Sequence, residues 1–295
     1  MAPADDATGR LGFNTASLYG YGLDEALEIG FGLGFRCVEV LAFEGYRNAA
    51  GEIAGRFFDR LSEAEIEGLA RRLERFDRVA VHAPFWDVLP FSPNACVREA
   101  TRDQLRTTLT VAGAIGAETV TTHVIPRLGY AFEEFRPDVV ALYRELGDVA
   151  SAAGVTLTIE TGYPREIHEF AALVHEIGHP AVGANVDVGH LRGLLTEAER
   201  EPEALGPAYN ALLAGHVESL GDQVYHVHLH DVRPEGVRDH REAGTGIVNY
   251  EAFFRMLVDR DYRGLLCFEL EDPEPVEALA RSRDVVLQAM QAAGL

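Results

Sequence analysis

The chain has 295 residues, 47% of them hydrophobic, which is enough to bury the core of two modest domains or of one barrel-sized domain. All 26 basic residues are arginines, and the 47 acidic residues leave a formal net charge of −21. The lack of lysine excludes catalysis through a lysine Schiff base, and the acidic balance argues against binding to nucleic acid phosphates.

The few cysteines and the N-terminal residues indicate the cellular compartment. Cys37, Cys96 and Cys267 are scattered, which suits a reducing compartment and argues against both a disulfide framework and a cysteine zinc site. The first ten residues lack the apolar core of a signal peptide, and no window approaches the roughly 18 apolar residues of a membrane span. We therefore expect a cytoplasmic protein with no membrane partner.

Short apolar runs rich in β-branched residues alternate with amphipathic segments along the whole chain. The runs that we interpret as strands are residues 11–16, 35–43, 78–85, 117–124, 155–162, 181–190, 224–232 and 264–272. Each run precedes a stretch that reads as a helix, with apolar positions three and four residues apart. Examples of these helical stretches are residues 23–34, 62–76, 98–116, 249–260 and 274–290.

Eight strand–helix units, spaced roughly 30 to 40 residues apart, predict an α/β protein with the (β/α)8 TIM-barrel fold. We expect a single TIM-barrel domain over residues 1–295, with residues 1–10 as a flexible N-terminal tail. A doubly wound open sheet is the alternative. It is less favoured because no glycine-rich phosphate-binding motif follows the first strand.

The run "YHVHLHDV", residues 225–232, contains three histidines in an otherwise apolar strand. Because successive side chains of a strand point to opposite faces, His226, His228 and His230 share one face. Taken alone, this pattern fits an edge strand with a solvated face as well as it fits a metal or catalytic site.

The same alternation, applied to the other strands, places further polar side chains inside the barrel near the carboxyl ends of the strands. These residues are Glu39, His82, His123, Glu160, Asp187, His228 and Glu269. TIM-barrel enzymes carry their catalytic residues at these strand ends, whereas the lower barrel is packed with apolar side chains. The shared position of the seven residues indicates a functional site.

Glu160, Asp187, His228 and Glu269 come from four consecutive strands, so closure of the barrel would gather them at its mouth. Three carboxylates and one imidazole suit Mn²⁺, Mg²⁺ or Co²⁺, and Zn²⁺ also fits. A second metal site that is richer in nitrogen, and would therefore favour zinc, is plausible from four further histidines: His82, His123, His190 and His240.

Seven segments together resemble one family over nearly the whole chain. In order they are "VHAPF", "TTHV", "IET", "NVDVGH", "HVHLHD", "HREAGTG" and "FELE". They resemble the xylose-isomerase-like TIM-barrel superfamily, which includes sugar phosphate isomerases and epimerases, inosose dehydratases and zinc apurinic endonucleases. The resemblance implies that Glu160, Asp187, His228 and Glu269 hold a divalent metal. It further implies that Glu160 and Glu269 move the proton in ketose epimerases and that His190 contacts a substrate oxygen.

The apurinic endonuclease branch of this superfamily uses additional ligands. His82, His123, His190 and His240 match positions of its trinuclear zinc site. The chain departs from that pattern at one place, because Arg238 stands where an aspartate precedes the last histidine by two residues, and the acid is Asp239 instead. This departure weakens the expectation of a third metal.

We therefore expect a metal-dependent isomerase or epimerase of a small polyhydroxylated carbonyl compound, such as a sugar, sugar phosphate or inosose. Proton transfer by Glu160 and Glu269 would pass through a metal-stabilised enediolate. A zinc phosphodiesterase of the apurinic endonuclease type, an inosose dehydratase-like lyase and a barrel that binds a ligand without catalysis are the alternatives. Duplex DNA is not expected as a substrate, given the net charge.

The expected substrate-binding residues are His190, His230, Trp86 and Arg238. Within the histidine strand, we expect His228 near the metal, His226 one layer below it, and His230 at the rim of the barrel. The sequence leaves the oligomeric state open, and a homo-oligomer is compatible with it.

Overall fold

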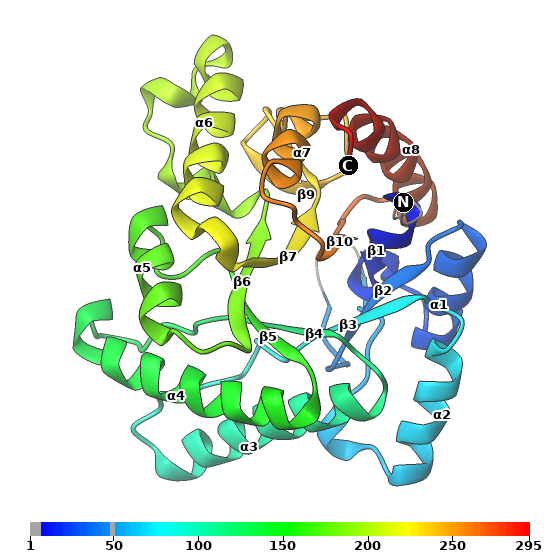
Figure 1. Ribbon diagram of the computed structural model, residues 1–295, viewed down its shortest axis with the longest axis vertical. Helices are drawn as coiled ribbons and strands as arrows, with labels where there is room; N and C mark the ends of the chain where they lie inside the picture. The colour runs from blue at the N-terminus through cyan, green and yellow to red at the C-terminus, as the bar shows by residue number, and fades with distance from the viewer. Residues whose placement is uncertain (1–6, 48–50) are drawn as a thin grey trace.

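The computed structural model describes residues 7–47 and 51–295. Within these ranges, eight parallel strands pair in the order β1-β10-β7-β6-β5-β4-β3-β2 and close into a barrel (Figure 1). The barrel strands are β1 (Leu11–Asn14), β2 (Cys37–Leu41), β3 (Arg78–His82), β4 (Thr119–Thr122), β5 (Thr156–Glu160), β6 (Val182–Asp187), β7 (Val224–Leu229) and β10 (Leu265–Phe268). The predicted (β/α)8 fold is confirmed, and the doubly wound sheet is excluded.

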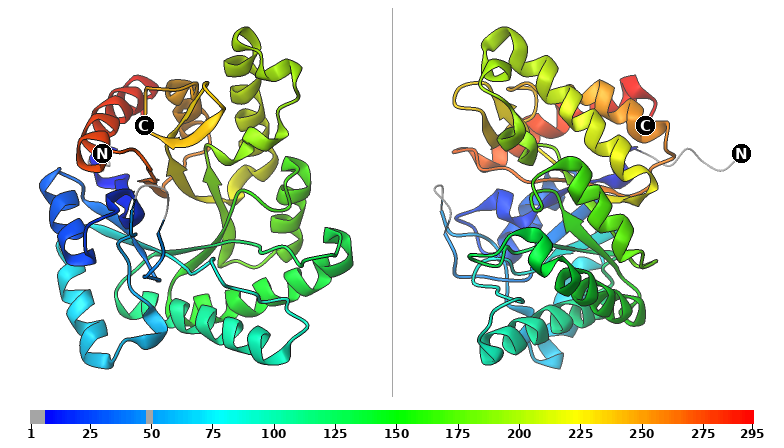
Figure 2. Two further views of the ribbon diagram at one scale, coloured as in Figure 1. Left: turned by 180° about the vertical axis from the view of Figure 1, so that it is seen from behind. Right: turned by 90° about the vertical axis from the view of Figure 1, so that its left-hand side faces the viewer.

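The helices form a ring around the barrel, as the views from behind and from the side also show (Figure 2). They are α1 (Leu23–Gly32), α2 (Glu63–Leu73), α3 (Ala95–Ala114), α4 (Phe132–Ala153), α5 (Ile167–Ile177), α6 (Pro202–Leu220), α7 (Tyr250–Val258) and α8 (Pro275–Ala293). Each helix follows one barrel strand in the chain. None of the helices in the described ranges combines the length and hydropathy needed to cross a bilayer.

The alternation of side chains along each strand separates two parts of the interior. In β2, Val38 and Val40 face the helices and belong to the large apolar core, whereas Cys37 and Glu39 point into the barrel. A small apolar cluster of Cys37, Ala80, Leu265 and Cys267 fills the lower barrel. The polar residues lie above this cluster, toward the carboxyl ends of the strands.

A two-stranded hairpin that we did not predict follows β7. It consists of β8 (Asp231–Arg233) and β9 (Arg238–Arg241), which pair in antiparallel fashion. The Asp231 carboxylate accepts hydrogen bonds from the backbone N–H groups of Val232, Gly244, Gly246 and Val248, at 2.8 to 3.0 Å. Asp231 therefore fixes the "GTG" turn against the hairpin, and the hairpin carries Asp239 and His240 to the mouth of the barrel.

The N-terminal segment is ordered closer to the start of the chain than expected. Residues Ala7–Arg10 form a short 3-10 helix, and the buried Arg10 side chain donates a hydrogen bond to the carbonyl of Tyr262 at 2.6 Å. The expected flexible tail over residues 1–10 is therefore wrong for residues 7–10. Residues 1–6 lie outside the described ranges.

Candidate metal and active site

Glu160, the last residue of β5, lies at the centre of the candidate site. Its Oε2 lies 3.3 Å from Nε2 of both His82 and His123 and 3.4 Å from Nδ1 of His228, and its Oε1 lies 3.2 Å from Nδ1 of His190. Burial raises the pKa of Glu160, but the imidazoles of His123 and His228 outweigh burial and hold that pKa well below its ordinary value. The buried Glu160 is therefore an ionised carboxylate.

Glu160, Asp187, His228 and Glu269 each offer a donor atom, and these four atoms lie within 4.8 Å of one another. His228 presents Nδ1 to this group, 2.9 Å from Glu269 Oε2 and 3.9 Å from Asp187 Oδ2. These contacts lie outside hydrogen-bond geometry, so the buried Nδ1 has no hydrogen-bond partner within the described ranges. A nitrogen donor without a partner, facing three carboxylates, fits a divalent cation.

The charge of His228 is consistent with a site that exchanges a proton for a cation. Burial lowers the pKa of His228, but the carboxylates of Glu39, Glu160 and Glu269 outweigh burial and raise it well above the ordinary value. The ring therefore carries a proton among these carboxylates when no cation is present. Because a metal ligand must supply a lone pair, a cation binding here would displace that proton.

Two buried residues hold the donor atoms in place from below and from the side. His228 donates a hydrogen bond from Nε2 to Oε2 of Glu39 at 2.8 Å. His230 accepts a hydrogen bond at Nδ1 from the backbone N–H of His240, so its proton is on Nε2, which lies 2.9 and 3.0 Å from the two oxygens of Asp187. Such outer contacts set the orientation and basicity of metal ligands.

A second donor set is built on Glu160 by His82, at the end of β3, and by His123, just after β4. His82 donates from Nδ1 to the carbonyl of Ala83 at 2.8 Å and from Nε2 to Oε2 of Glu160 at 3.3 Å, so Nε2 would have to give up its proton to bind a cation. That Nε2 lies 3.3 Å from Nε2 of His123. Burial lowers the pKa of His123 to about 4, so this ring is neutral at physiological pH and able to bind a cation.

A third donor set is formed by His190, Asp239 and His240. The backbone of His240 has a φ of +53°, in the left-handed region, and this break in the strand alternation lets the adjacent Asp239 and His240 face the same site. Oδ1 of Asp239 lies 3.4 Å from Nδ1 of His240, while its Oδ2 pairs with Nε of Arg192 at 2.6 Å. In the endonuclease pattern the aspartate stands at the position of Arg238. Here the acid that lies beside His240 is Asp239 instead.

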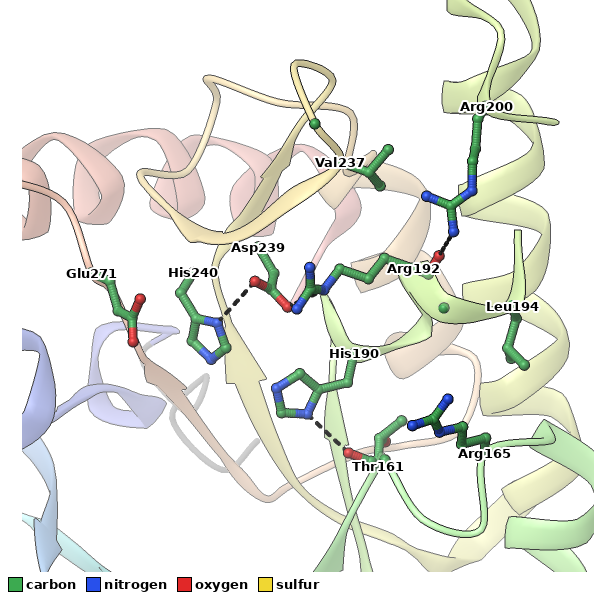
Figure 3. Close-up of a pocket in the computed structure, with 13 residues that line it drawn as sticks. Thr161, Arg165, His190, Arg192, Leu194, Arg200, Val237, Asp239, His240 and Glu271 are labelled. Carbon is green, nitrogen blue, oxygen red and sulfur yellow. Dashed lines mark hydrogen bonds and ion pairs between the residues drawn. The ribbon is translucent and has the colours of Figure 1, made fainter. Parts of the chain in front are cut away.

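The donor sets open into a cavity of about 180 Å³. Glu160, Glu269, His82, His123, His190 and His240 form its polar side. Phe43, Phe85 and Trp86 form an apolar wall, with ring centroids 4.9 to 5.9 Å apart. A larger cavity of about 570 Å³ adjoins it on the side of β5 and β6 and shares His190, His240 and Glu271 with it (Figure 3).

The structure brings together most of the residues predicted to form the site. The four expected metal ligands converge, and the four histidines of the expected second site join them in two sets rather than one. His190 and Trp86 line the 180 Å³ cavity, as a substrate-binding role requires. That role itself is a prediction that the structure does not test.

Two expected positions differ from the structure. His230 is fully buried rather than at the rim, because it turns inward to Asp187, and Arg238 is exposed and lines neither cavity. His226 lies one layer down, as expected, with its Nε2 3.6 Å from Oε2 of Glu39. We did not predict Asp239 as a donor, and the only signal for it was its place beside His240.

Residues 27–289 match the model of the xylose isomerase-like TIM barrel family. The chain belongs to this family. A curated relative in sequence is an uncharacterized protein, MJ1311, of Methanocaldococcus jannaschii, which is 23% identical over 244 residues, 78% of this chain and 76% of the relative.

Several solved structures resemble this member of the xylose isomerase-like family over nearly its whole length. A D-tagatose 3-epimerase-like protein has a TM-score of 0.72 at 21% identity, covering 97% of this chain and 98% of its own. An L-ribulose 3-epimerase has a TM-score of 0.70 at 17% identity, covering 97% and 95%. A Mycobacterium smegmatis protein of the family, in complex with magnesium, has a TM-score of 0.69 at 18% identity, covering 96% and 97%. At these identities the likeness establishes the fold.

Proposed function

We propose that the protein is a divalent-metal-dependent epimerase or isomerase of a small polyhydroxylated carbonyl compound. The observation that carries this proposal is the convergence of Glu160, Asp187, His228 and Glu269. Two of the four, Glu160 and Glu269, line a cavity with one apolar wall. Three similar structures support the proposal: an L-ribulose 3-epimerase, a D-tagatose 3-epimerase-like protein, and a protein of the same family in complex with magnesium.

Glu160, Asp187, His228 and Glu269 would hold the cation. This mostly oxygen donor set suits Mn²⁺, Mg²⁺ or Co²⁺, with Zn²⁺ as a further candidate. A bound cation would polarise the substrate carbonyl and so acidify the neighbouring C–H bond.

Glu160 and Glu269 would move the proton. Both carboxylates line the 180 Å³ cavity, and they come from strands that are not neighbours in the barrel. Burial raises the pKa of Glu269, but His228 outweighs burial and lowers it, so this carboxylate is ionised, as Glu160 is. One ionised carboxylate would take the proton beside the carbonyl and later release it to solvent. The other, after taking up a proton from solvent, would deliver that proton to the opposite face of the same carbon. This transfer inverts that carbon.

The apolar wall would orient the substrate and exclude water from the reacting carbon. Trp86 and Phe85 follow β3 and make edge-to-face contacts with Phe43, which follows β2. The faces of such rings pack against the C–H bonds of a sugar, while the opposite, polar side of the cavity accepts and donates hydrogen bonds to hydroxyl groups.

Exchange of substrate hydrogen with solvent tests the proposal. Protein stripped with a chelator would be reloaded separately with Mn²⁺, Mg²⁺, Co²⁺ or Zn²⁺ and incubated with ketoses and inososes in D₂O, with products followed by NMR. We expect deuterium to enter at the carbon beside the carbonyl only with metal present. Glu160→Gln and Glu269→Gln should each remove this exchange, whereas Glu118→Gln, which lies at the opposite end of the barrel, should retain it. Metal-loaded protein that exchanges no hydrogen with any such compound would contradict the proposal.

A second candidate function is a zinc-dependent phosphodiesterase of the apurinic endonuclease type. It is favoured by the two additional donor sets, His82–His123–Glu160 and His190–Asp239–His240, which flank the four-ligand set. The net charge of −21 without lysine opposes it, because duplex binding depends on neutralising phosphates. Three zinc ions per chain by elemental analysis, together with cleavage of an abasic-site duplex at physiological salt, would favour this function over the first.

A further inference from the structure

The 570 Å³ cavity beside the metal-ligand sets is lined by three arginines (Figure 3). Arg165 lies in the turn after β5, and Arg192 and Arg200 lie in the segment between β6 and α6. Figure 3 shows the three guanidinium groups on different sides of the cavity. The chain has 47 acidic residues and only 26 basic ones, so a group of three arginines beside a candidate active site indicates a ligand that binds to them.

The acidic residues that line this cavity already have arginine partners. Asp239 pairs with Arg192 at 2.6 Å, and Glu271 pairs with Arg241 at 3.3 Å. The carboxylates of the cavity are thus neutralised from within the protein. They leave the charge of the two other arginines uncompensated.

Arg200 and Arg165 are these two arginines. Arg200 donates to the backbone carbonyls of Leu195 and Arg192, at 3.2 and 2.8 Å, so its guanidinium is held in place by neutral partners. For Arg165, no hydrogen bond or ion pair is formed with any part of the chain that the structure describes. Neither arginine has a carboxylate within ion-pair distance among the described residues. Two guanidinium charges in one cavity without a counter-ion attract an anion.

The arginine cavity is continuous with the candidate catalytic cavity, because His190, His240 and Glu271 line both. Resting on the function proposed above, we propose that the substrate carries an anionic group, a phosphate or a carboxylate, at the end remote from its reacting carbonyl. The carbonyl end lies over Glu160 and Glu269, and the anionic end lies between Arg165 and Arg200. The arginines after β5 and β6 thus select an acidic sugar derivative over a neutral sugar.

A small anion suits this cavity better than a nucleic acid does. Duplex DNA needs an extended positive surface that contacts several phosphates, and the net charge of −21 opposes it. A single phosphate or carboxylate is matched by the planar hydrogen-bonding edges of one or two guanidinium groups.

Binding of simple anions to metal-free protein tests the cavity without requiring catalysis. Inorganic phosphate and glycolate would be titrated by calorimetry at low ionic strength into wild-type protein, Arg165→Gln and Arg56→Gln. Arg56 follows β2 at the same end of the barrel and lines neither of the two cavities, so its variant controls for the change in net charge. We expect Arg165→Gln to weaken binding of at least one anion tenfold or more and Arg56→Gln to leave it unchanged. Equal binding to all three proteins would overturn the proposal.

Turnover of matched substrates then separates this proposal from the proposed function. D-fructose, D-fructose 6-phosphate and D-fructuronate present a neutral, a phosphate and a carboxylate end, respectively. In the wild-type protein, we expect kcat/KM for one of the two anionic compounds to exceed kcat/KM for fructose at least tenfold. In Arg165→Gln, the kcat/KM for that anionic compound should fall to near the value for fructose. The preferred anion distinguishes phosphate from carboxylate.

Each remaining outcome is decisive for one of the two proposals. Anion binding that depends on Arg165, without turnover of any compound, would overturn the epimerase function and support the anion site. Preference for the neutral ketose, or cleavage of an abasic-site duplex that depends on Arg165, would overturn the anionic small-molecule substrate.

Discussion

Glu39 and His228, which are 189 residues apart in the chain, are joined by a buried hydrogen bond of 2.8 Å between Oε2 of the carboxylate and Nε2 of the imidazole. This bond turns Nδ1 of His228 toward Glu160, Asp187 and Glu269. Glu39 also accepts a hydrogen bond from Nδ2 of Asn14 at 3.2 Å, which fixes its position. Glu39 is therefore a positioning residue for His228, the proposed metal ligand, and lies outside the proposed four-ligand set.

The first prediction concerns this pair. Glu39→Gln should lower the affinity for Mn²⁺ about 10- to 100-fold, because the amide is a weaker acceptor and no longer supports the basicity of His228. Titration of metal-free protein, with circular dichroism to confirm folding, measures the effect. Glu118→Gln, which removes a carboxylate from an ion pair with Arg78 at the far end of the barrel, should bind metal like the wild type. Unchanged affinity in Glu39→Gln would show that the hydrogen bond plays no part in the site.

The second prediction concerns His230, which holds Asp187. His230→Ala should lower metal affinity about 10- to 100-fold by freeing the Asp187 carboxylate, whereas His228→Ala should abolish binding because it removes a ligand. Gly189→Ala should resemble His230→Ala, since a Cβ at Gly189 would lie 2.0 Å from Cε1 of His230. Gly193→Ala is the control, because a Cβ there meets no atom within 4 Å. If His230→Ala alters only the KM for substrate and leaves metal affinity intact, His230 belongs to the substrate site instead.

The third prediction concerns Asp231, which accepts four backbone hydrogen bonds from the "GTG" turn and the hairpin. Asp231→Asn should lower the free energy of unfolding by about 2 to 4 kcal/mol, because an amide NH₂ group would face backbone donors. Urea unfolding measures this loss. The exposed Asp222→Asn should stay within about 0.5 kcal/mol of the wild type. An equally small effect for Asp231→Asn would contradict the role of this carboxylate.

The fourth prediction concerns pH and the buried His216, whose Nε2 lies 2.9 Å from Oγ1 of Thr161. Burial lowers the pKa of His216 from 6.5 to about 4, so between these pH values the unfolded chain binds a proton that the folded protein does not. Stability should therefore be lost as pH falls from 6.5 toward 4, with His216 contributing about 3 kcal/mol of that loss.

Urea unfolding at pH 7.5 and pH 4.5 isolates this contribution. His216→Gln keeps a donor toward Thr161 but cannot take up a proton, so its stability should fall less between the two pH values than that of the wild type. His168→Gln, a change at an exposed position, should follow the wild type. Identical pH dependence in all three proteins would mean that His216 does not titrate differently on folding.

The strands, their order along the chain and the inward side of each strand could be predicted from the sequence. Backbone geometry makes side chains alternate along a strand, so a pattern such as "TLTIE" states by itself that Thr156, Thr158 and Glu160 share a face. The spacing of the strand–helix units then indicates a closed barrel, which places Glu160, Asp187, His228 and Glu269 at one mouth. These inferences depend only on local periodicity and on the short loops between elements.

Only the tertiary structure decided which ring nitrogen of His228 faces the three carboxylates, where His230 lies, and which acid joins His240. The orientation of His228 depends on Glu39, a partner from a distant strand that is close only because the barrel closes. The placement of Asp239 depends on the left-handed backbone at His240, which breaks the alternation on which the sequence argument relied. The grouping of Arg165 with Arg200 likewise arises where the loops after two neighbouring strands meet. Sequence periodicity specifies the direction of a side chain, whereas its partners are set by distances that exist only in the folded chain.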